Sequence, residues 1–477
     1  MPKINVNIKW SGKKFENMEL DTDESPELFK TQIYSQTGVA PERQKIMVKG
    51  GILKDTTDLN QLNLKEGHTF MVMGTAGELP KAPPKPVQFL EDLTDAEVME
   101  VLNIPPGLEN LGNTCYMNAT LQCMRAMPEL QTSLEQYQGT LNGVDNRSSL
   151  IASLRDLFTN LSKASDGFPP LVFWQMLRQT FPQFSQTGQG GMPMQQDAEE
   201  CWSELVSVLK AKLPQTDSKN FIERYMTGQL ESITACEEAP EEEKTVANDE
   251  FNKLSCHISI NTNYMIHGIM ESLNETIEKV SPSLNRTAQY QRKNRVTRLP
   301  QYLPVQFIRF FWKPQEGVRA KILRKVKFPL EFDATELCTP ELQNKFSKAK
   351  LKIKEVEDKK IQREREEKRR KLDGEGVQSM DTAEDVIDWK EYLDPELVKD
   401  VGCNPTGQYE LCAVLTHVGR SADSGHYIGW VKNKTDEWYK FDDDKVSTLR
   451  DADIERLDGG GDWHTAYIVL YRAKKLE

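Results

Sequence analysis

A proline-rich stretch near residue 80 constrains the fold of this chain more than any other feature of its sequence. The segment LPKAPPKPVQF contains four prolines, and neither a helix nor a central strand tolerates proline at that density. We therefore expect a semi-stiff spacer at residues 76–102, between one folded unit at 1–75 and a second at 103–475. A chain of 477 residues has room for two or more cores, because single cores stop growing at about 250–300 residues.

The composition favours a folded protein with a polar surface. Hydrophobic residues make up 38% and charged residues 28% of the chain, which is enough apolar material for packed cores. No run approaches the roughly 18 apolar residues that a membrane helix requires, and the opening MPKINVNIKW lacks the apolar region of a signal peptide. We expect a cytoplasmic or nuclear protein with no membrane span.

Net charge and cysteine spacing argue against two further classes of protein. A formal net charge of −12 has the wrong sign for a surface that follows nucleic-acid phosphates. Eight cysteines are scattered without a CxxC pair, so neither a disulfide scaffold nor a zinc ribbon is predicted. We expect no nucleic-acid partner, no metal and no other cofactor.

The first 75 residues have the pattern of a small mixed domain. Apolar and polar side chains alternate between Ile4 and Ile8, which is typical of a half-buried strand. A helix is predicted between Ser25 and Gly38, with two strands before it and two after it. This ββαββ order resembles the ubiquitin-like fold. Unlike ubiquitin, the chain continues through Gly74 without a terminal diglycine, so a docking role is expected instead of conjugation.

Two charged segments interrupt the larger unit. The first is EEAPEEEK at residues 237–244, and the second is an insert at about 345–385 that contains IQREREEKRRK. The insert is predicted to be either an exposed helix with interleaved charges or a disordered segment. Its KRRK run also matches a nuclear signal, although charge runs of this kind are usually ordinary solvated surface.

The segment GLENLGNTCYMNATLQCM, residues 107–124, places a cysteine at a helix start. Gly112 and Asn113 interrupt the preceding pattern, and apolar residues then recur at helical spacing. The unpaired amides and the dipole at such a position favour a thiolate at Cys115 over a thiol, as a nucleophile requires. A buried packing cysteine is the alternative that spacing alone leaves open.

A base for this cysteine is suggested by the segments HYIGWVK and EWYKFDD. They predict an antiparallel hairpin whose turn lies at residues 433–436, midway between His426 and Asp442. Folding the hairpin places these two side chains nearly opposite each other. A carboxylate on one ring nitrogen leaves the other nitrogen to take the thiol proton. Asp443 and Asp444 remain rivals of Asp442, separated only by the alternation of strand faces.

The cysteine segment at residues 107–124 resembles the cysteine box of the ubiquitin-specific proteases, and the hairpin around His426 resembles their histidine box. The segments MQQDAEECWSELVSVL and LPVQFIRFFW extend the match. With the ubiquitin-like unit in front, the layout is similar to that of the proteasome-associated members of this family. The resemblance implies an α+β fold, in which a ubiquitin-like β-grasp domain precedes a papain-like cysteine protease domain with fingers, palm and thumb. It also implies hydrolysis after the C-terminal glycine of ubiquitin. The implied partners are ubiquitin, ubiquitinated proteins and the regulatory particle of the 26S proteasome.

Carried over by position, the resemblance assigns roles to individual residues. Cys115 would be the nucleophile, His426 the base and Asp442 the residue that orients it, while Asn110 would donate a hydrogen bond to the oxyanion. The residues implied to hold the C-terminal tail of ubiquitin are Gln196, Asp197, Glu200 and Tyr427. Helix capping and ordinary solvation are the alternative for the two acids. A catalytically silent ubiquitin-binding adaptor of the proteasome is the alternative function.

The segment before His426 is bounded by glycines and has no large apolar anchor. It is therefore predicted to be a mobile loop over the cleft. The resemblance implies that such loops obstruct the ubiquitin-tail channel in the free enzyme and open on docking. The residues assigned to this gate are Gly419, Arg420, Ser421, Ser424 and Gly425.

The fingers region departs from the pattern of many family members, which hold zinc there with two CxxC pairs. Residues 220–300 contain only Cys236 and Cys256, and four tetrahedral ligands cannot be assembled from them. We expect fingers that are held by packing alone.

Overall fold

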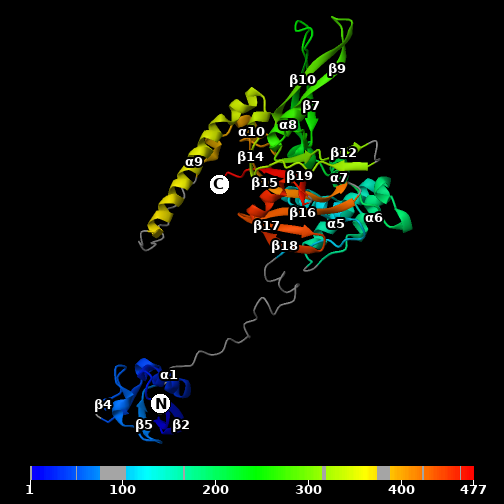
Figure 1. Cartoon of the computed structure of the whole chain (residues 1–477). Helices are drawn as coiled ribbons and strands as arrows, with labels where there is room; N and C mark the ends of the chain where they lie inside the picture. Colours follow the sequence, from blue (N-terminus) through cyan, green and yellow to red (C-terminus); the bar gives the residue numbers. More distant parts are fainter. Residues whose placement is uncertain are drawn as a thin grey trace. The chain divides into compact units, whose positions relative to one another are not determined.

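The computed structural model describes residues 3–49, 51–75, 104–164, 167–313, 318–372, 387–421, 424–461 and 463–476. The chain forms two compact units, Met1–Leu93 and Thr94–Glu477 (Figure 1). The spacer that the sequence predicts at residues 76–102 lies outside the described residues.

The first unit is a five-stranded sheet with one helix packed on it. The strand order is β2-β1-β5-β3-β4, in which β1 pairs antiparallel with β2 and parallel with β5. The predicted helix is confirmed, since α1 begins with proline after Ser25 and ends where Gly38 adopts a left-handed φ of 68°. The elements are β1 (Lys3–Trp10), β2 (Lys13–Asp21), α1 (Pro26–Thr37), η1 (Pro41–Arg43), β3 (Lys45–Val48), β4 (Gly51–Ile52), η2 (Leu59–Leu62) and β5 (Thr69–Met73).

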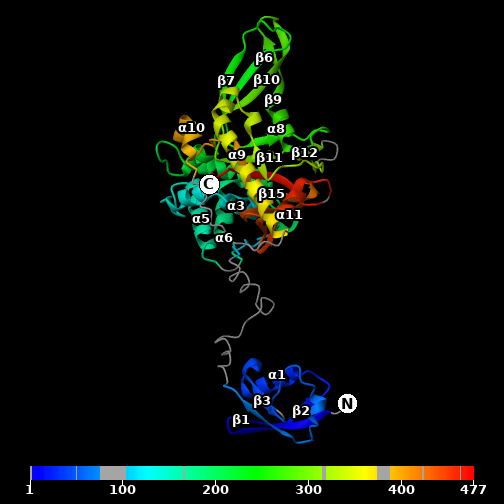
Figure 2. The same cartoon turned by 90° about the vertical axis from the view of Figure 1, so that its left-hand side faces the viewer.

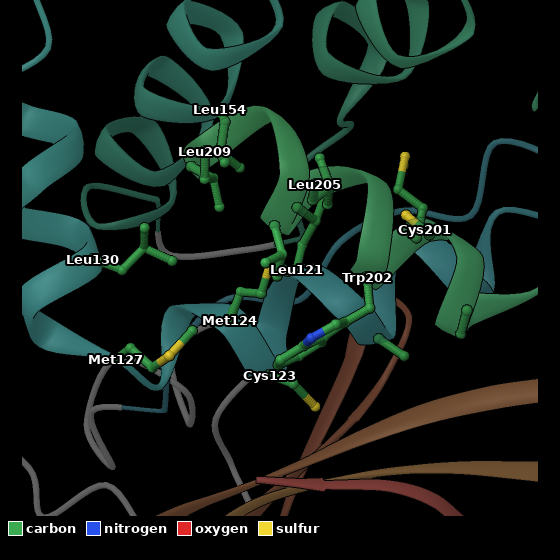
Figure 3. Packing of buried hydrophobic residues seen from close by; sticks show 14 of the residues in the cluster. Leu121, Cys123, Met124, Met127, Leu130, Leu154, Cys201, Trp202, Leu205 and Leu209 are labelled. Carbon is green, nitrogen blue, oxygen red and sulfur yellow. The ribbon is translucent and has the colours of Figure 1, made fainter. Parts of the chain in front are cut away.

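The second unit begins with a helical layer in which α3 is the central element. Almost every side chain of α3 is buried, and Leu121 and Met124 pack against Trp202 and Leu205 of α7 (Figure 3). The elements of this layer are α3 (Cys115–Arg125), α4 (Pro128–Glu135), α5 (Asn146–Leu161), α6 (Leu171–Thr180), η4 (Pro182–Ser185), η5 (Gln189–Gly191), α7 (Ala198–Lys212) and η6 (Ile222–Met226).

A ten-stranded sheet lies against this layer, and its strand β16 contacts α3. Its main path is β18-β17-β16-β15-β19-β11-β8, so that β19 lies between β15 and β11. Gly429 on β16 faces Ala119, where an added Cβ would come within 3.2 Å of a backbone oxygen. The strands are β8 (Leu254–Cys256), β11 (Tyr302–Phe307), β12 (Phe310–Lys313), β13 (Val318–Lys321), β14 (Glu331–Asp333), β15 (Gln408–Ser421), β16 (Ser424–Lys434), β17 (Glu437–Asp442), β18 (Lys445–Leu449) and β19 (Thr465–Ala473).

A separate four-stranded sheet projects from the second unit in both views (Figure 2). We call it the fingers sheet, and its order is β7-β6-β10-β9. Cys236 ends β6 and packs in a small apolar cluster with Tyr290, whereas Cys256 belongs to the core beside β11. In the described part of the chain, no cluster of His, Cys, Asp and Glu is placed to hold a metal ion. The strands are β6 (Gly228–Cys236), β7 (Thr245–Phe251), β9 (Asn274–Ser281) and β10 (Arg286–Arg298).

The charged insert is helical as far as residue 372, and its remainder to 385 lies outside the described residues. The helix α9 (Pro340–Leu372) is anchored at its start by buried Leu342, Phe346 and Ala349, and its later part is exposed. None of the described helices is both long and apolar enough to span a membrane. The other short helices are α8 (Met265–Leu273), η7 (Thr335–Leu337), η8 (Trp389–Glu391), α10 (Pro395–Lys399), α11 (Asp451–Ile454) and η9 (Glu455–Asp458).

Candidate active site

Cys115 is the first residue of α3, and Asn110 shapes the turn before it. The Oδ1 of Asn110 accepts hydrogen bonds from the backbone amides of Gly112 at 2.9 Å and Thr114 at 3.2 Å. Asn113 has a left-handed φ of 55° in the same turn, a conformation that asparagine adopts more readily than most residues. The thiol therefore lies where the amides and dipole of a helix start favour negative charge.

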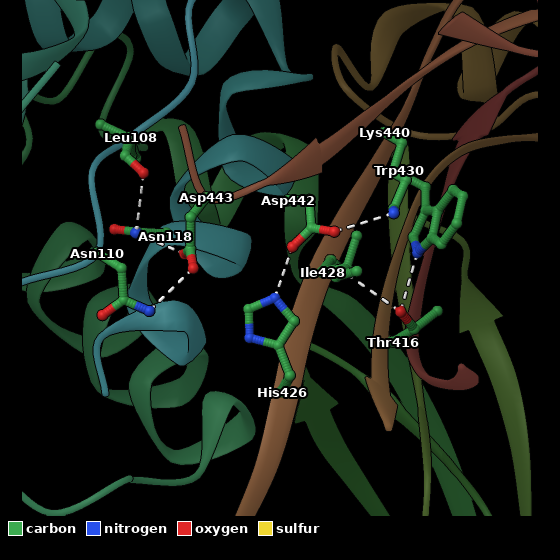
Figure 4. A network of polar contacts seen from close by, with 10 residues as sticks. All are labelled: Leu108, Asn110, Asn118, Thr416, His426, Ile428, Trp430, Lys440, Asp442 and Asp443. Atoms are coloured by element: carbon green, nitrogen blue, oxygen red, sulfur yellow. Dashed lines mark hydrogen bonds and ion pairs between the residues drawn. The ribbon is translucent and has the colours of Figure 1, made fainter. Parts of the chain in front are cut away.

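A hydrogen bond of 2.6 Å joins Nε2 of His426 to Oδ1 of Asp442 (Figure 4). His426 lies on β16 and Asp442 ends β17, and the two strands form the predicted antiparallel hairpin. Because Phe441 pairs with Gly429, His426 and Asp442 are diagonal neighbours and not directly opposite. The hairpin is centred one residue beyond the midpoint of His426 and Asp442, which produces this offset, and diagonal side chains on one face remain within reach of each other.

The side chains of Cys115, His426 and Asp442 influence one another's charge state. The pKa of His426 is raised to about 10, chiefly by the hydrogen bond to Asp442 and next by a hydrogen bond to the Cys115 thiol. The bond to His426 also holds the pKa of the Asp442 carboxyl well below its usual range. An imidazolium next to sulfur stabilises the thiolate relative to the thiol, so this arrangement is suited to nucleophilic chemistry.

Asp443 serves a different partner from its neighbour Asp442. The carboxylate of Asp443 accepts hydrogen bonds from Nδ2 of Asn110 at 2.9 Å and from Nδ2 of Asn118 at 2.8 Å (Figure 4). Its φ of 55° ends the strand and turns its side chain toward α3. Sequence reasoning missed Asn118, although its position one helical turn after Cys115 was a usable signal.

Asp197 caps α7, because its Oδ1 accepts the backbone amide of Glu199 at 2.8 Å. The same carboxylate accepts a hydrogen bond of 2.9 Å from the hydroxyl of Tyr467, a residue that the sequence did not single out. Both residues line a cavity of about 190 Å³ together with aromatic side chains of β12, Phe310, Phe311 and Trp312. Asp197 therefore both caps α7 and lines the cavity.

The other residues assigned to the ubiquitin tail are not among those that line this cavity, and they differ in burial. Gln196 and Tyr427 are buried, and Glu200 is partly buried in the first turn of α7. The Tyr427 ring lies 4.6 Å from that of His417, a histidine whose pKa is lowered to about 3 by burial. His417 is thus a neutral histidine that packs against Tyr427.

The sequence predicts a loop at residues 419–425, but the described residues of this segment belong to strands, so the predicted secondary structure is wrong. Gly419, Arg420 and Ser421 end β15, while Ser424 and Gly425 begin β16, and Ser421 pairs with Ser424. The two residues between them lie outside the described part of the chain. The small and polar residues of this segment favour a loop, whereas the pairing of β15 with β16 continues as far as Ser421 and Ser424.

Gly425 has a packing reason to be glycine. Its φ is 130°, and a Cβ there would lie 2.1 Å from the backbone oxygen of Val418 and 2.6 Å from Nε2 of His417. The close approach keeps β15 and β16 together just before His426. This glycine therefore supports the position of the imidazole.

Comparison with known proteins shows which families the two units resemble. The family model described as ubiquitin carboxyl-terminal hydrolase matches residues 106–471, and the model of the ubiquitin family matches residues 4–77. Ubiquitin carboxyl-terminal hydrolase 7 of Arabidopsis thaliana is 41% identical over 99% of each chain, and ubiquitin carboxyl-terminal hydrolase 6 of Schizosaccharomyces pombe is 43% identical over 99% of each. Ubiquitin carboxyl-terminal hydrolase 14 of Caenorhabditis elegans is 34% identical over 99% of this chain and 94% of its own.

Proposed function

The chain belongs to the ubiquitin carboxyl-terminal hydrolase family and is a deubiquitinating hydrolase, and we propose that it removes ubiquitin from conjugates held at the 26S proteasome. The observation that carries this proposal is the presence, in one chain, of a ubiquitin-like domain and a cysteine placed beside a histidine–aspartate pair. A cytoplasmic and nuclear location is part of the proposal, since the conjugates would be met there.

In the proposed mechanism the Cys115 thiolate attacks the carbonyl carbon of ubiquitin's terminal glycine. The imidazolium of His426 gives its proton to the departing amine, so the isopeptide bond breaks and a thioester forms. A water molecule that loses a proton to His426 then hydrolyses the thioester and regenerates the thiolate. Asp442 fixes the ring tautomer throughout, because its Oδ1 holds Nε2 at 2.6 Å.

Asn110 is the proposed donor to the oxyanion that forms during attack. One N–H of its amide is committed to Asp443, which fixes the orientation of the amide plane. The other N–H of Asn110 and the backbone N–H of Cys115 would then stabilise the oxyanion. One such donor contributes roughly 3 kcal/mol to the transition state.

The proposed site for the tail of ubiquitin is the cavity beside the start of α7. Asp197 lines it, and Glu200 lies one helical turn further on. Carboxylates at this place suit the arginine of the tail, because charge-assisted hydrogen bonds to arginine are strong and directional. Gln196 and Tyr427 would complete the channel toward Cys115.

The proposed docking surface is the exposed face of the sheet in the ubiquitin-like domain. Met47 on β3 pairs with Ile52 on β4 and with Met71 on β5, and all three side chains are exposed, as is Met73. We call these four residues the β-face patch. A contiguous apolar surface of this kind marks an interaction site, and the proteasome regulatory particle is its proposed partner.

The hairpin end formed by Gly419, Arg420, Ser421, Ser424 and Gly425 is proposed as the gate of the tail channel. It immediately precedes His426 on β16, so a shift of its arms would change access to the imidazole. Docking at the proteasome would favour the open arrangement.

The test is turnover of a fluorogenic ubiquitin substrate by the purified full-length chain, with and without purified 26S proteasomes. Turnover that depends on Cys115 and rises when proteasomes are added supports the proposal. Tight ubiquitin binding with no turnover in either condition would replace it with the adaptor function. Turnover that ignores proteasomes would leave a deubiquitinase without the proposed regulation.

A further inference from the structure

The two oxygens of the Asp442 carboxylate are held by different cations. Oδ1 bonds Nε2 of His426 at 2.6 Å, and Oδ2 accepts a hydrogen bond of 2.9 Å from Nζ of Lys440 (Figure 4). Lys440 and Asp442 are two residues apart on β17 and therefore project from the same face of the sheet. The lysine side chain is only 26% exposed, so the ion pair is partly shielded from water.

Lys440 is itself held in place by the neighbouring strand. It pairs with Trp430 on β16, and its Nζ lies 5.8 Å from the centre of the indole ring. The indole in turn donates a hydrogen bond of 2.9 Å to Oγ1 of Thr416 on β15. Three adjacent strands thus fix the ammonium group next to the carboxylate.

We propose that Lys440 is a positioning residue of the active site, which orients the Asp442 carboxylate toward His426 and whose charge sets the pH range of activity. The inference rests on the proposed roles of Cys115, His426 and Asp442. Without Lys440 the carboxylate could rotate about its terminal bond, because only one of its oxygens would remain bound by the site. Lys440 would act through Asp442 and touch no reacting atom.

The charge of Lys440 moves the two limbs of the pH profile in the same direction. A cation near the site favours the thiolate of Cys115 and disfavours the imidazolium of His426. Removing the Lys440 charge should therefore move both limbs of the bell-shaped pH profile of activity toward alkaline pH. The other titratable groups that interact with His426 are Asp442 and Asp443 on the hairpin, and the neighbouring His417 and His464. All of them remain in the variant.

The test compares Lys440→Met with the parent chain over a range of pH. Hydrolysis of a fluorogenic ubiquitin substrate gives kcat/KM, and alkylation of Cys115 by iodoacetamide reports the thiolate directly. We expect about tenfold lower kcat/KM at neutral pH from lost orientation and a shift of both limbs by about half a pH unit. The shift should shrink in 1 M salt, because the pair is partly exposed.

Three further variants make the result specific. Lys440→Arg keeps the charge and should restore the pH profile. Lys440→Gln removes the charge while keeping a donor, and gives a second measurement should the methionine variant fail to fold. Lys432→Met is the matched control, because Lys432 lies 5.9 Å from the centre of the Trp438 ring on the same hairpin, away from the carboxylate.

Failure of this inference is distinguishable from failure of the proposed function. A bell-shaped profile in the parent with limbs that Lys440→Met and Lys440→Gln leave in place would overturn the role of Lys440 alone. Equal shifts in Lys432→Met would also overturn it. A parent chain without turnover that depends on Cys115 would overturn the proposed function instead.

Discussion

Asn110 donates a hydrogen bond to Asp443 across 333 residues of sequence, at 2.9 Å. The bond connects the turn before Cys115 directly to the residue after the carboxylate that orients His426. The nucleophile and its base belong to different layers, a helix and a sheet. Their mutual placement therefore depends on polar contacts at this junction as well as on apolar packing.

Replacing Cys115 by alanine should abolish hydrolysis and leave ubiquitin binding intact. Only the covalent step requires sulfur, and the side chain is 2% exposed within a well-packed helix. Turnover of a fluorogenic ubiquitin substrate and calorimetric titration with ubiquitin check the two parts. Cys123→Ala, eight residues further along α3, is the control for a change in packing alone. Substantial turnover by the Cys115 variant would refute its role.

Asp442→Asn should chiefly lower kcat, whereas Asp443→Asn should lower kcat less and also reduce stability. The first should lower kcat on the order of 10³-fold to 10⁴-fold, because the amide no longer holds the correct histidine tautomer. The second should lower kcat roughly tenfold through the misplaced Asn110 amide. It should also cost about 1–2 kcal/mol of stability, since an amide at 443 can accept from only one of the two asparagines.

Steady-state kinetics and thermal unfolding of both variants separate these effects. If Asp443→Asn is the more damaging change to kcat, the assignment of Asp442 as the orienting residue is wrong.

Stability that depends on His426 should disappear as the pH rises. The folded pKa of about 10 lies above the ordinary histidine value of roughly 6.5. The contribution is therefore complete below about pH 6.5 and is lost as the pH approaches 10. The Tm difference between the parent and His426→Gln should be largest near pH 6 and smallest near pH 10.

His464→Gln provides the control of opposite sign. Burial lowers the pKa of His464 to about 4, so this residue penalises folding only at acid pH. Its variant should differ little from the parent between pH 7 and 10. A Tm difference for His426→Gln that does not change over this range would contradict the charge state described for the pair.

A charge in the β-face patch should weaken association with the proteasome. Ile52→Asp places a carboxylate among Met47, Met71 and Met73, where an apolar partner surface would have to desolvate it. Co-sedimentation with purified proteasomes measures the effect, and turnover without proteasomes should be unchanged. Leu28→Asp on α1 is the matched control, with 49% exposure against 46% for Ile52.

Deleting residues 1–75 should leave the second unit folded and reduce co-sedimentation at least as much as Ile52→Asp. Equal binding by the parent, the deletion variant and Ile52→Asp would remove the docking role.

Hydrogen exchange at residues 419–425 should slow when ubiquitin binds. Their arms lie in the β-ladder just before His426, and ubiquitin bound in the tail channel would limit local opening of that ladder. Exchange followed by mass spectrometry provides the measurement, with β2 of the first unit as the internal reference. Exchange that ignores ubiquitin would leave the hairpin end as an ordinary connection.

The histidine hairpin could be predicted because its signals are local. Two β-branched and aromatic segments flank a polar turn, and strand alternation then brings residues 426 and 442 near each other. Strand alternation separates Asp442 from Asp443 but places Asp444 on the same face as Asp442. The strand ends at Asp442 and the backbone of Asp443 is left-handed, which the alternation does not predict.

Long-range polar contacts were beyond sequence reasoning. The bond from Tyr467 to Asp197 joins residues 270 positions apart, and nothing in either segment marks the other. The glycine and serine composition of the hairpin end predicts a loop, because glycine is a poor strand former. Pairing with the neighbouring arm overrides that preference.

The position of β19 between β15 and β11 has a consequence for synthesis. The strand spans Thr465–Ala473, and it is the only direct neighbour that joins the histidine hairpin to β11 in the described sheet path. A ribosome-bound chain that lacks these residues would carry the thiol and the imidazole without a completed sheet to align them. The nascent enzyme would therefore be unable to cleave ubiquitin until its final strand has emerged and inserted.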